Sequence, residues 1–238
     1  MTGALTVEIW RGGDQGAMQA FAVPRAEKQT VLDVVTYVQR RLDPSLAYRF
    51  ACRVGMCGSC AMTVNGKPRW TCRTNVDAVA RKGRLELRPL RNMPVIKDLA
   101  VDMSGFFDKW QQAGGRFVAT DTRDDAIARV APTGRERQAA DAGIECINCG
   151  ICNAACDVVA WDRDYLGPAA LNRAWTLMND VRDGDEDGRL RAVTAGSGCV
   201  SCHSQGSCAR YCPNGLNPSA SIAGLKRLAL LAALRGGP

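Results

Sequence analysis

The sequence has no apolar run near the roughly 18 residues that a membrane span requires. Its best apolar stretch, Leu228–Leu234, is far too short, so we expect any membrane contact to be made through a partner. Residues 1–8 also lack the basic segment and apolar run of a secretory signal. The missing signal, and the ligand-like grouping of the cysteines in a chain long enough to bury a core, favour reduced thiols over a disulfide scaffold for the 12 cysteines.

The charge is positive overall but unevenly distributed. Residues 1–100 contain 16 Lys and Arg against 8 Asp and Glu, a net of +8, whereas residues 101–238 contain 15 against 16, a net of −1. The basic residues are scattered and are not interleaved with aromatic side chains, so we expect no nucleic-acid partner. We interpret the basic half as a solvated surface that favours docking to an acidic protein.

The first cysteine group has the spacing C-x4-C-x2-C and a distant fourth member. It consists of Cys52, Cys57, Cys60 and Cys72. This spacing is typical of plant-type 2Fe–2S sites. Gly55 and Gly58 suit a loop whose backbone passes close to the sulfurs and directs N–H groups at them. A tetrahedral zinc site fits this spacing poorly.

Two further groups follow in the second half of the chain. One has the spacing C-x2-C-x2-C-x3-C, namely Cys146, Cys149, Cys152 and Cys156. The other comprises Cys202, Cys208 and Cys212, with Gln205 at the middle ligand position of the same template. In two-cluster ferredoxins the fourth cysteine of a group binds the other cluster.

Exchanging the fourth ligands predicts two unequal sites. A 4Fe–4S cluster would take a complete set of thiolates from Cys146, Cys149, Cys152 and Cys212. A 3Fe–4S cluster would take the three thiolates of Cys156, Cys202 and Cys208, because the carboxamide of Gln205 is a poor iron ligand. Cys199 leaves an alternative open: it is either a buried spectator thiol or a fourth ligand that makes the second site 4Fe–4S.

The pattern of the first hundred residues predicts a β-grasp sheet. We expect strands at Leu5–Trp10, Met18–Val23 and Leu85–Arg88, and a hairpin at Met62–Trp70 that turns at Asn65-Gly66. Thr30 and Asp33 form a capping box that opens a helix reaching about Leu42.

Beyond residue 105 the pattern becomes helical. Phe106, Phe107 and Trp110 fall at helical spacing and are predicted to be core residues. Further helices are expected to begin at a Thr133 capping box, at Gly167-Pro168 (ending near Asn179) and at Asn217-Pro218, with an exposed loop over Asp180–Arg189. The predicted fold is therefore α+β: a plant-type ferredoxin domain over 1–105 and an all-α two-cluster ferredoxin domain over 106–238.

Several stretches beyond the cysteines add to this pattern. They are Leu42-Asp-Pro-Ser-Leu-Ala47, Cys57-Gly-Ser-Cys-Ala-Met62, Val95-Ile-Lys-Asp-Leu99, Glu145-Cys-Ile-Asn-Cys-Gly150, Leu166-Gly-Pro-Ala-Ala-Leu171 and Cys212-Pro213. With the three cysteine groups, they make nearly the whole chain resemble the iron–sulfur subunit of succinate dehydrogenases and fumarate reductases.

The resemblance implies an electron relay. Electrons would pass from an FAD-containing flavoprotein subunit through the 2Fe–2S, 4Fe–4S and 3Fe–4S clusters to a quinone at an integral-membrane anchor, with fumarate reductases running the reverse path. It implies a peripheral position on the cytoplasmic face of the inner membrane and no catalytic acid or base in this chain. His203 and Trp161 match the family's quinone-site residues, although a supporting histidine and a core tryptophan are the plainer alternatives.

Three features depart from the family pattern. Asp157 replaces the usual proline after Cys156 and would lower the local reduction potential. The segment around Trp161 is slightly short, and Cys199 is additional.

The alternative functions are a relay for another flavoprotein dehydrogenase, a free-standing ferredoxin-like carrier, and a zinc ribbon built from the pairs Cys149/Cys152 and Cys199/Cys202. The direction of the reaction and the quinone are not encoded in these motifs.

Overall fold

A computed structural model describes residues 4–236 of the chain. The chain divides into two compact units. The first extends to Met103 and also includes Ile147–Ala155, and the second contains Ser104–Cys146 and the chain from Cys156 onward. The sequence predicted two contiguous domains that meet at residue 105. In the structure, residues 147–155 belong instead to the first unit.

The first unit is built on a five-stranded sheet with the order β2-β1-β5-β3-β4. Its strands are β1 (Ala4–Arg11), β2 (Ala17–Pro24), β3 (Ala61–Val64), β4 (Lys67–Trp70) and β5 (Arg84–Arg88). The central strands β1 and β5 run parallel, with Val7 opposite Leu85, and the other pairs are antiparallel. This arrangement confirms the β-grasp prediction.

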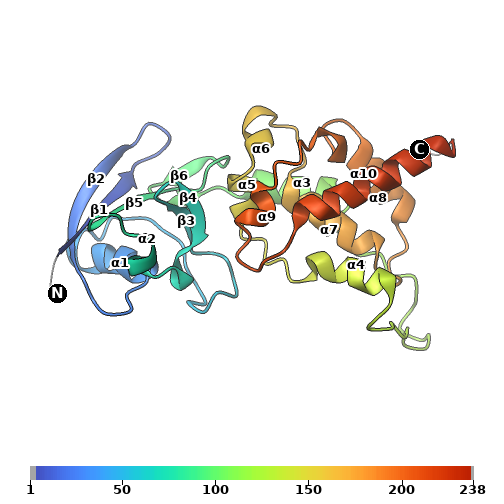
Figure 1. Ribbon diagram of the computed structural model, residues 1–238, viewed down its shortest axis with the longest axis horizontal. Helices are drawn as coiled ribbons and strands as arrows, with labels where there is room; N and C mark the ends of the chain where they lie inside the picture. Colours follow the sequence, from blue (N-terminus) through green and yellow to red (C-terminus); the bar gives the residue numbers. More distant parts are fainter. Residues whose placement is uncertain (1–3, 237–238) are drawn as a thin grey trace. The chain divides into compact units, whose positions relative to one another are not determined.

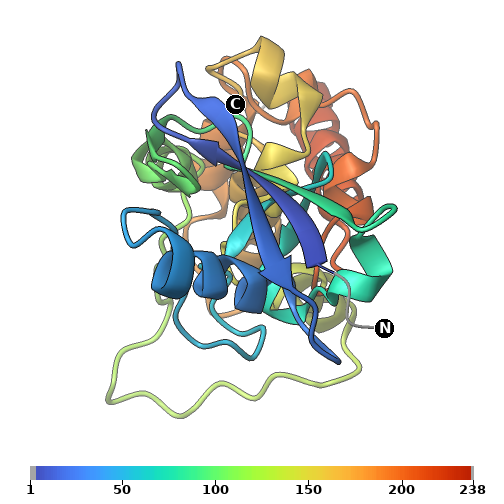
Figure 2. The same cartoon turned by 90° about the vertical axis from the view of Figure 1, so that its left-hand side faces the viewer.

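One helix covers the sheet. Helix α1 (Val31–Tyr37) continues into the π-helical turn η1 (Val38–Leu42) beside the sheet (Figure 2). Its valines are buried in one cluster with side chains of the strands. The buried side chains of β1 alternate with exposed ones along the strand, since successive residues point to opposite faces. The capping box is present: Thr30 Oγ1 accepts the Asp33 N–H at 3.2 Å, and Asp33 Oδ2 accepts the Thr30 N–H at 3.0 Å.

The predicted hairpin joins β3 to β4. Asn65 and Gly66 both have left-handed backbones, with φ of 47° and 76°, as a two-residue hairpin turn requires. The remaining elements of this unit are short. They are η2 (Thr71–Arg73), α2 (Val76–Val79), β6 (Val95–Lys97), β7 (Ala100–Val101) and, on the returning segment, α5 (Ile151–Ala154).

The second unit is helical. Its elements are α3 (Ser104–Gln112), α4 (Arg135–Ile144), α6 (Asp157–Trp161), α7 (Pro168–Met178), α8 (Glu186–Thr194), η3 (Cys199–Ser201), α9 (Ser207–Arg210) and α10 (Pro218–Leu234). Helix α7 is central and runs beside α10 (Figure 1). Leu171 and Ala174 of α7 are fully buried in one cluster with Ile222 and Leu225 of α10.

Three local predictions for the second unit were wrong in part. Helix α4 begins after Gly134, which provides no side-chain cap, so Thr133 does not open it. Phe106 is buried, but Phe107 is 43% exposed. The expected loop over 180–189 ends in helix α8, and Arg189 is fully buried with its Nη1 2.6 Å from Asp183. Across residues 4–236, no helix is both long and apolar enough to span a membrane.

Candidate iron–sulfur centres

The first thiol group lies on a loop of the first unit whose N–H groups point at sulfur. Cys52 Sγ accepts hydrogen bonds from the N–H groups of Val54, Met56 and Cys57 at 3.5, 3.2 and 3.3 Å. The loop can turn this tightly because Gly55 and Gly58 have φ of 79° and 69°. N–H donors stabilise a thiolate, which is the form that binds iron.

The other three thiols of this group, those of Cys57, Cys60 and Cys72, lie on or beside the same loop. Burial raises the pKa of the Cys57 thiol, but hydrogen bonds from Cys52 and Ser59 outweigh it and bring the pKa to about 6. Cys60 and Cys72 are buried beside Leu32, and Cys60 Sγ accepts the Cys72 N–H at 3.5 Å. Burial and the neighbouring Cys60 raise the pKa of Cys72 to about 11. The donor set therefore fits a 2Fe–2S cluster.

A second constellation lies within the second unit, around a small cavity. Cys156 caps α6, Cys202 follows η3 and Cys208 belongs to α9, and all three side chains line this cavity together with Gln205. Burial raises the pKa of Cys156 and of Cys208. The three thiols that share this space are the ones predicted to bind a 3Fe–4S cluster, and Gln205, predicted not to bind iron, lines it with them.

These thiols surround a space and do not meet at one point. In the part of the chain that the structure describes, no three Cys, His, Asp or Glu side chains are placed to share a single metal ion. A cluster of several irons needs separated thiolates, each binding its own iron. The arrangement is thus compatible with a cluster.

Cys199 is not among the described residues that line this cavity. It is fully buried in the apolar cluster formed with residues such as Val193 and Leu225, although Cys156 and Cys202 pack against the same cluster. Burial raises the pKa of its thiol. This environment favours the interpretation of Cys199 as a spectator thiol.

The two predicted quinone-site residues contact one another in the second unit. The rings of Trp161 and His203 lie 6.3 Å apart, edge to face at 88°. His203 also lines the cavity of the three thiols. Trp161 is 68% exposed, so the alternative that it is a core aromatic was wrong.

Sequence reasoning missed one residue that contacts the backbone of Cys202 and one that lines this cavity. Lys226 Nζ donates to the carbonyl oxygen of Cys202 at 2.6 Å. Tyr165 is 1% exposed and lines the cavity, and burial, followed by the charge of Cys202, raises the pKa of its phenol. Neither belongs to a ligand motif, and a contact with a backbone carbonyl leaves no signal in the sequence.

The cysteines of the remaining set are divided between the two units. Cys149 and Cys152 are on the returning segment of the first unit, whereas Cys146 and Cys212 belong to the second. Within the second unit, Asn214 Nδ2 donates to the Glu145 carbonyl at 2.7 Å, which ties the loop after Cys212 to the residue before Cys146. Their union around a 4Fe–4S cluster is a prediction from spacing.

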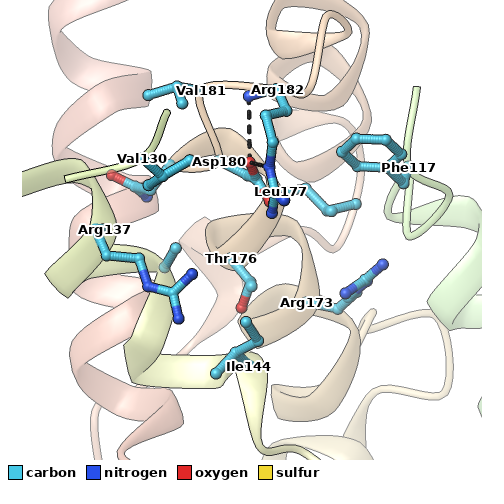
Figure 3. A pocket seen from close by; sticks show the side chains of 12 residues that line it. Phe117, Val130, Arg137, Ile144, Arg173, Thr176, Leu177, Asp180, Val181 and Arg182 are labelled. Carbon is cyan, nitrogen blue, oxygen red and sulfur yellow. Dashed lines mark hydrogen bonds and ion pairs between the residues drawn. The ribbon is translucent and has the colours of Figure 1, made fainter. Parts of the chain in front are cut away.

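A larger cavity, about 330 Å³ in volume, lies elsewhere in the second unit, between α4 and α7 (Figure 3). None of the described residues that line it is a predicted site residue. Its charges are largely matched within the protein: Arg137 pairs with Asp141 at 2.8 Å and Arg182 with Asp180 at 2.7 Å. The guanidinium of Arg173 stacks on Trp110, 5.4 Å from the ring centre.

Comparison with known proteins identifies both halves of the chain. The family described as a 2Fe-2S iron-sulfur cluster binding domain matches residues 6–108, and the 4Fe-4S dicluster domain family matches residues 145–217. A solved structure titled "Mycobacterium smegmatis Sdh1 complex in the apo form" contains a chain with a TM-score of 0.87 and 25% identity, with coverage of 100% of this chain and 99% of that one.

Curated relatives carry the same assignment. The fumarate reductase iron-sulfur subunit of Mycobacterium tuberculosis is 37% identical, with 91% of this chain and 87% of the relative covered. The mitochondrial succinate dehydrogenase [ubiquinone] iron-sulfur subunit 1 of Oryza sativa is 35% identical, with 84% and 71% covered. The chain therefore belongs to the family of iron–sulfur subunits of succinate dehydrogenases and fumarate reductases.

Proposed function

We propose that this subunit relays electrons between the dicarboxylate site of an FAD-containing flavoprotein subunit and a quinone at an integral-membrane anchor, in the succinate:quinone direction. The clusters, when bound, supply the one-electron carriers 2Fe–2S, 4Fe–4S and 3Fe–4S. The chain's own residues hold them and tune their potentials. The names of the relatives, which include both succinate dehydrogenase and fumarate reductase, support the pairing with dicarboxylate chemistry.

The observation that carries this proposal is the cavity of three thiols. Cys156, Cys202 and Cys208 line it with Gln205, while Cys199 is in the apolar core. A site limited to three thiolates favours a 3Fe–4S cluster as the last carrier before the quinone. Cys146, Cys149, Cys152 and Cys212 would hold the middle cluster, and Cys52, Cys57, Cys60 and Cys72 the one nearest the flavoprotein.

The quinone end of the relay is proposed at the exposed Trp161–His203 pair. His203 lines the three-thiol cavity, and the ring of Trp161 lies 6.3 Å from the ring of His203. Val200, three residues before His203, is 67% exposed and Trp161 is 68% exposed, so apolar surface is available for an anchor subunit. We propose a peripheral position on the cytoplasmic face of the inner membrane, as the family resemblance implies.

The direct test is the activity of the purified complex. Succinate-dependent quinone reduction and quinol-dependent fumarate reduction are measured with the same preparation, and the faster reaction assigns the direction. Purification as an active complex with a flavoprotein and a membrane polypeptide supports the proposal. A stable monomer without dicarboxylate activity, or a flavoprotein partner acting on other substrates, contradicts it.

The variant His203→Ala tests the quinone end separately. We expect quinone reduction to fall roughly 10–100-fold, the usual cost of removing a group that supports a metal site. Reduction of a water-soluble dye at the flavoprotein should persist, because that reaction does not use the quinone end. Arg191→Ala, at an exposed position of α8, is the control. Equal loss of both activities would contradict the assignment.

A further inference from the structure

The loop of the first thiol group lies directly against a cysteine of the second group. Gly58, between Cys57 and Cys60, is buried, and a β-carbon built there would lie 2.8 Å from Cys149 Cα and closer still to Cys149 Cβ. The Cα and Cβ atoms of Cys149 are fixed by the backbone, so no side-chain rotation can move them away. Only a glycine lets the two loops approach this closely. Both residues belong to the first unit.

Other contacts hold the same segment in place. Asn92 Nδ2 donates to the Asn153 carbonyl at 2.9 Å. A β-carbon at Gly150 would lie 2.6 Å from Met93 Cε, the flexible end of a side chain. Residues 147–155 are therefore fixed to the ferredoxin sheet unit at several points, and the least compressible of these glycine contacts is at Gly58.

We propose that Gly58 is a positioning residue for electron transfer between the first and second clusters. This inference rests on the proposed function, since it takes Cys57 and Cys60 as ligands of one cluster and Cys149 as a ligand of the next. The transfer would move a single electron between the two clusters when they are bound, with no bond formed or broken and no proton moved. The missing side chain of Gly58 sets how closely the two ligand loops approach, and so sets the distance that the electron crosses.

The variant Gly58→Ala in the purified complex tests the proposal. The readout is the magnetic interaction between the reduced 2Fe–2S and 4Fe–4S clusters, seen as splitting or broadening in low-temperature EPR, because this interaction weakens steeply with distance. We expect each cluster to keep its own signal while the interaction decreases, and succinate-to-quinone turnover to fall with it.

Gly66→Ala is the matched control. Gly66 has a φ of 76°, close to the 69° of Gly58, so alanine meets the same left-handed strain. Beyond its chain neighbours, no atom of the described residues lies within 4 Å of its β-position. The magnetic interaction in this variant should equal that of the wild type. A loss as large as in Gly58→Ala would overturn the proposal, because backbone strain alone would then explain both.

A second variant covers the case in which Gly58→Ala fails to assemble its 2Fe–2S cluster. Asn92→Gly keeps the left-handed backbone of Asn92, whose φ is 65°, and removes the amide that holds Asn153. A weaker magnetic interaction supports the positioning of the returning segment; an unchanged one overturns it. A wild-type complex that lacks either cluster signal contradicts the proposed function itself, which distinguishes the two failures.

Discussion

At the residue scale, the chemistry of this subunit depends on what surrounds each thiol. Cys52 receives three N–H groups, whereas Cys199 lies among aliphatic side chains. Cys208 occupies an intermediate setting, since it is buried yet lines the cavity of the three thiols and lies 3.7 Å from Ser219 Oγ. The same residue type is thus a proposed ligand in one place and a packing residue in another.

The variants Cys199→Ala and Cys208→Ala separate these roles. Cys199→Ala should keep the full iron content and lose about 1 kcal/mol of stability, the typical cost of a point mutation. Cys208→Ala should lose the iron of the third cluster, because one of its three thiolates is gone. Iron and sulfide analysis of the purified complex provides the measurement. Iron loss in Cys199→Ala would make Cys199 a ligand.

At the element scale, a buried ion pair holds α8 in the second unit. Arg189 and Asp183 are 0% and 1% exposed, and the guanidinium also donates to the carbonyls of Gly114 and Arg116 at 2.8 and 2.9 Å. These bonds satisfy the charge inside the protein and connect α8 to the turn after α3. A buried pair of this kind is costly to break from one side.

Arg189→Met should therefore destabilise the second unit by about 3–5 kcal/mol, since Asp183 would stay buried without its partner. Arg182→Ala is the control, because its pair with Asp180 is 44% exposed on the arginine side and should cost within about 1 kcal/mol. Denaturant unfolding of the two variants measures the difference. Equal midpoints would show that the Arg189 pair contributes little.

Sequence reasoning succeeded where structure is local. The Thr30 capping box, the Asn65-Gly66 hairpin and the alternation of β1 depend on neighbours a few residues away. Sequence reasoning failed at Arg189, because the charged residues and glycines around it are typical of an exposed loop. The groups that accept hydrogen bonds from its buried guanidinium lie up to 75 residues away in the chain. The docking of residues 147–155 was missed for the same reason. Gly58 lies against Cys149, which is far from it in the sequence.

At the scale of the whole molecule, the subunit is a scaffold for electron carriers, as its family membership indicates. The first unit provides four thiols on and beside one loop, and the second unit provides three around one cavity. The difference between a complete and an incomplete thiol set is the centre of this account. It predicts that the last cluster lacks a fourth iron.

Low-temperature EPR of the purified complex tests this claim most directly. The sample is measured as isolated under air and again after reduction with dithionite. The account predicts a 3Fe–4S signal in the oxidised sample, with 2Fe–2S and 4Fe–4S signals appearing on reduction. An oxidised sample without a 3Fe–4S signal, followed by two 4Fe–4S signals on reduction, would contradict the three-thiol assignment and make Cys199 the fourth ligand.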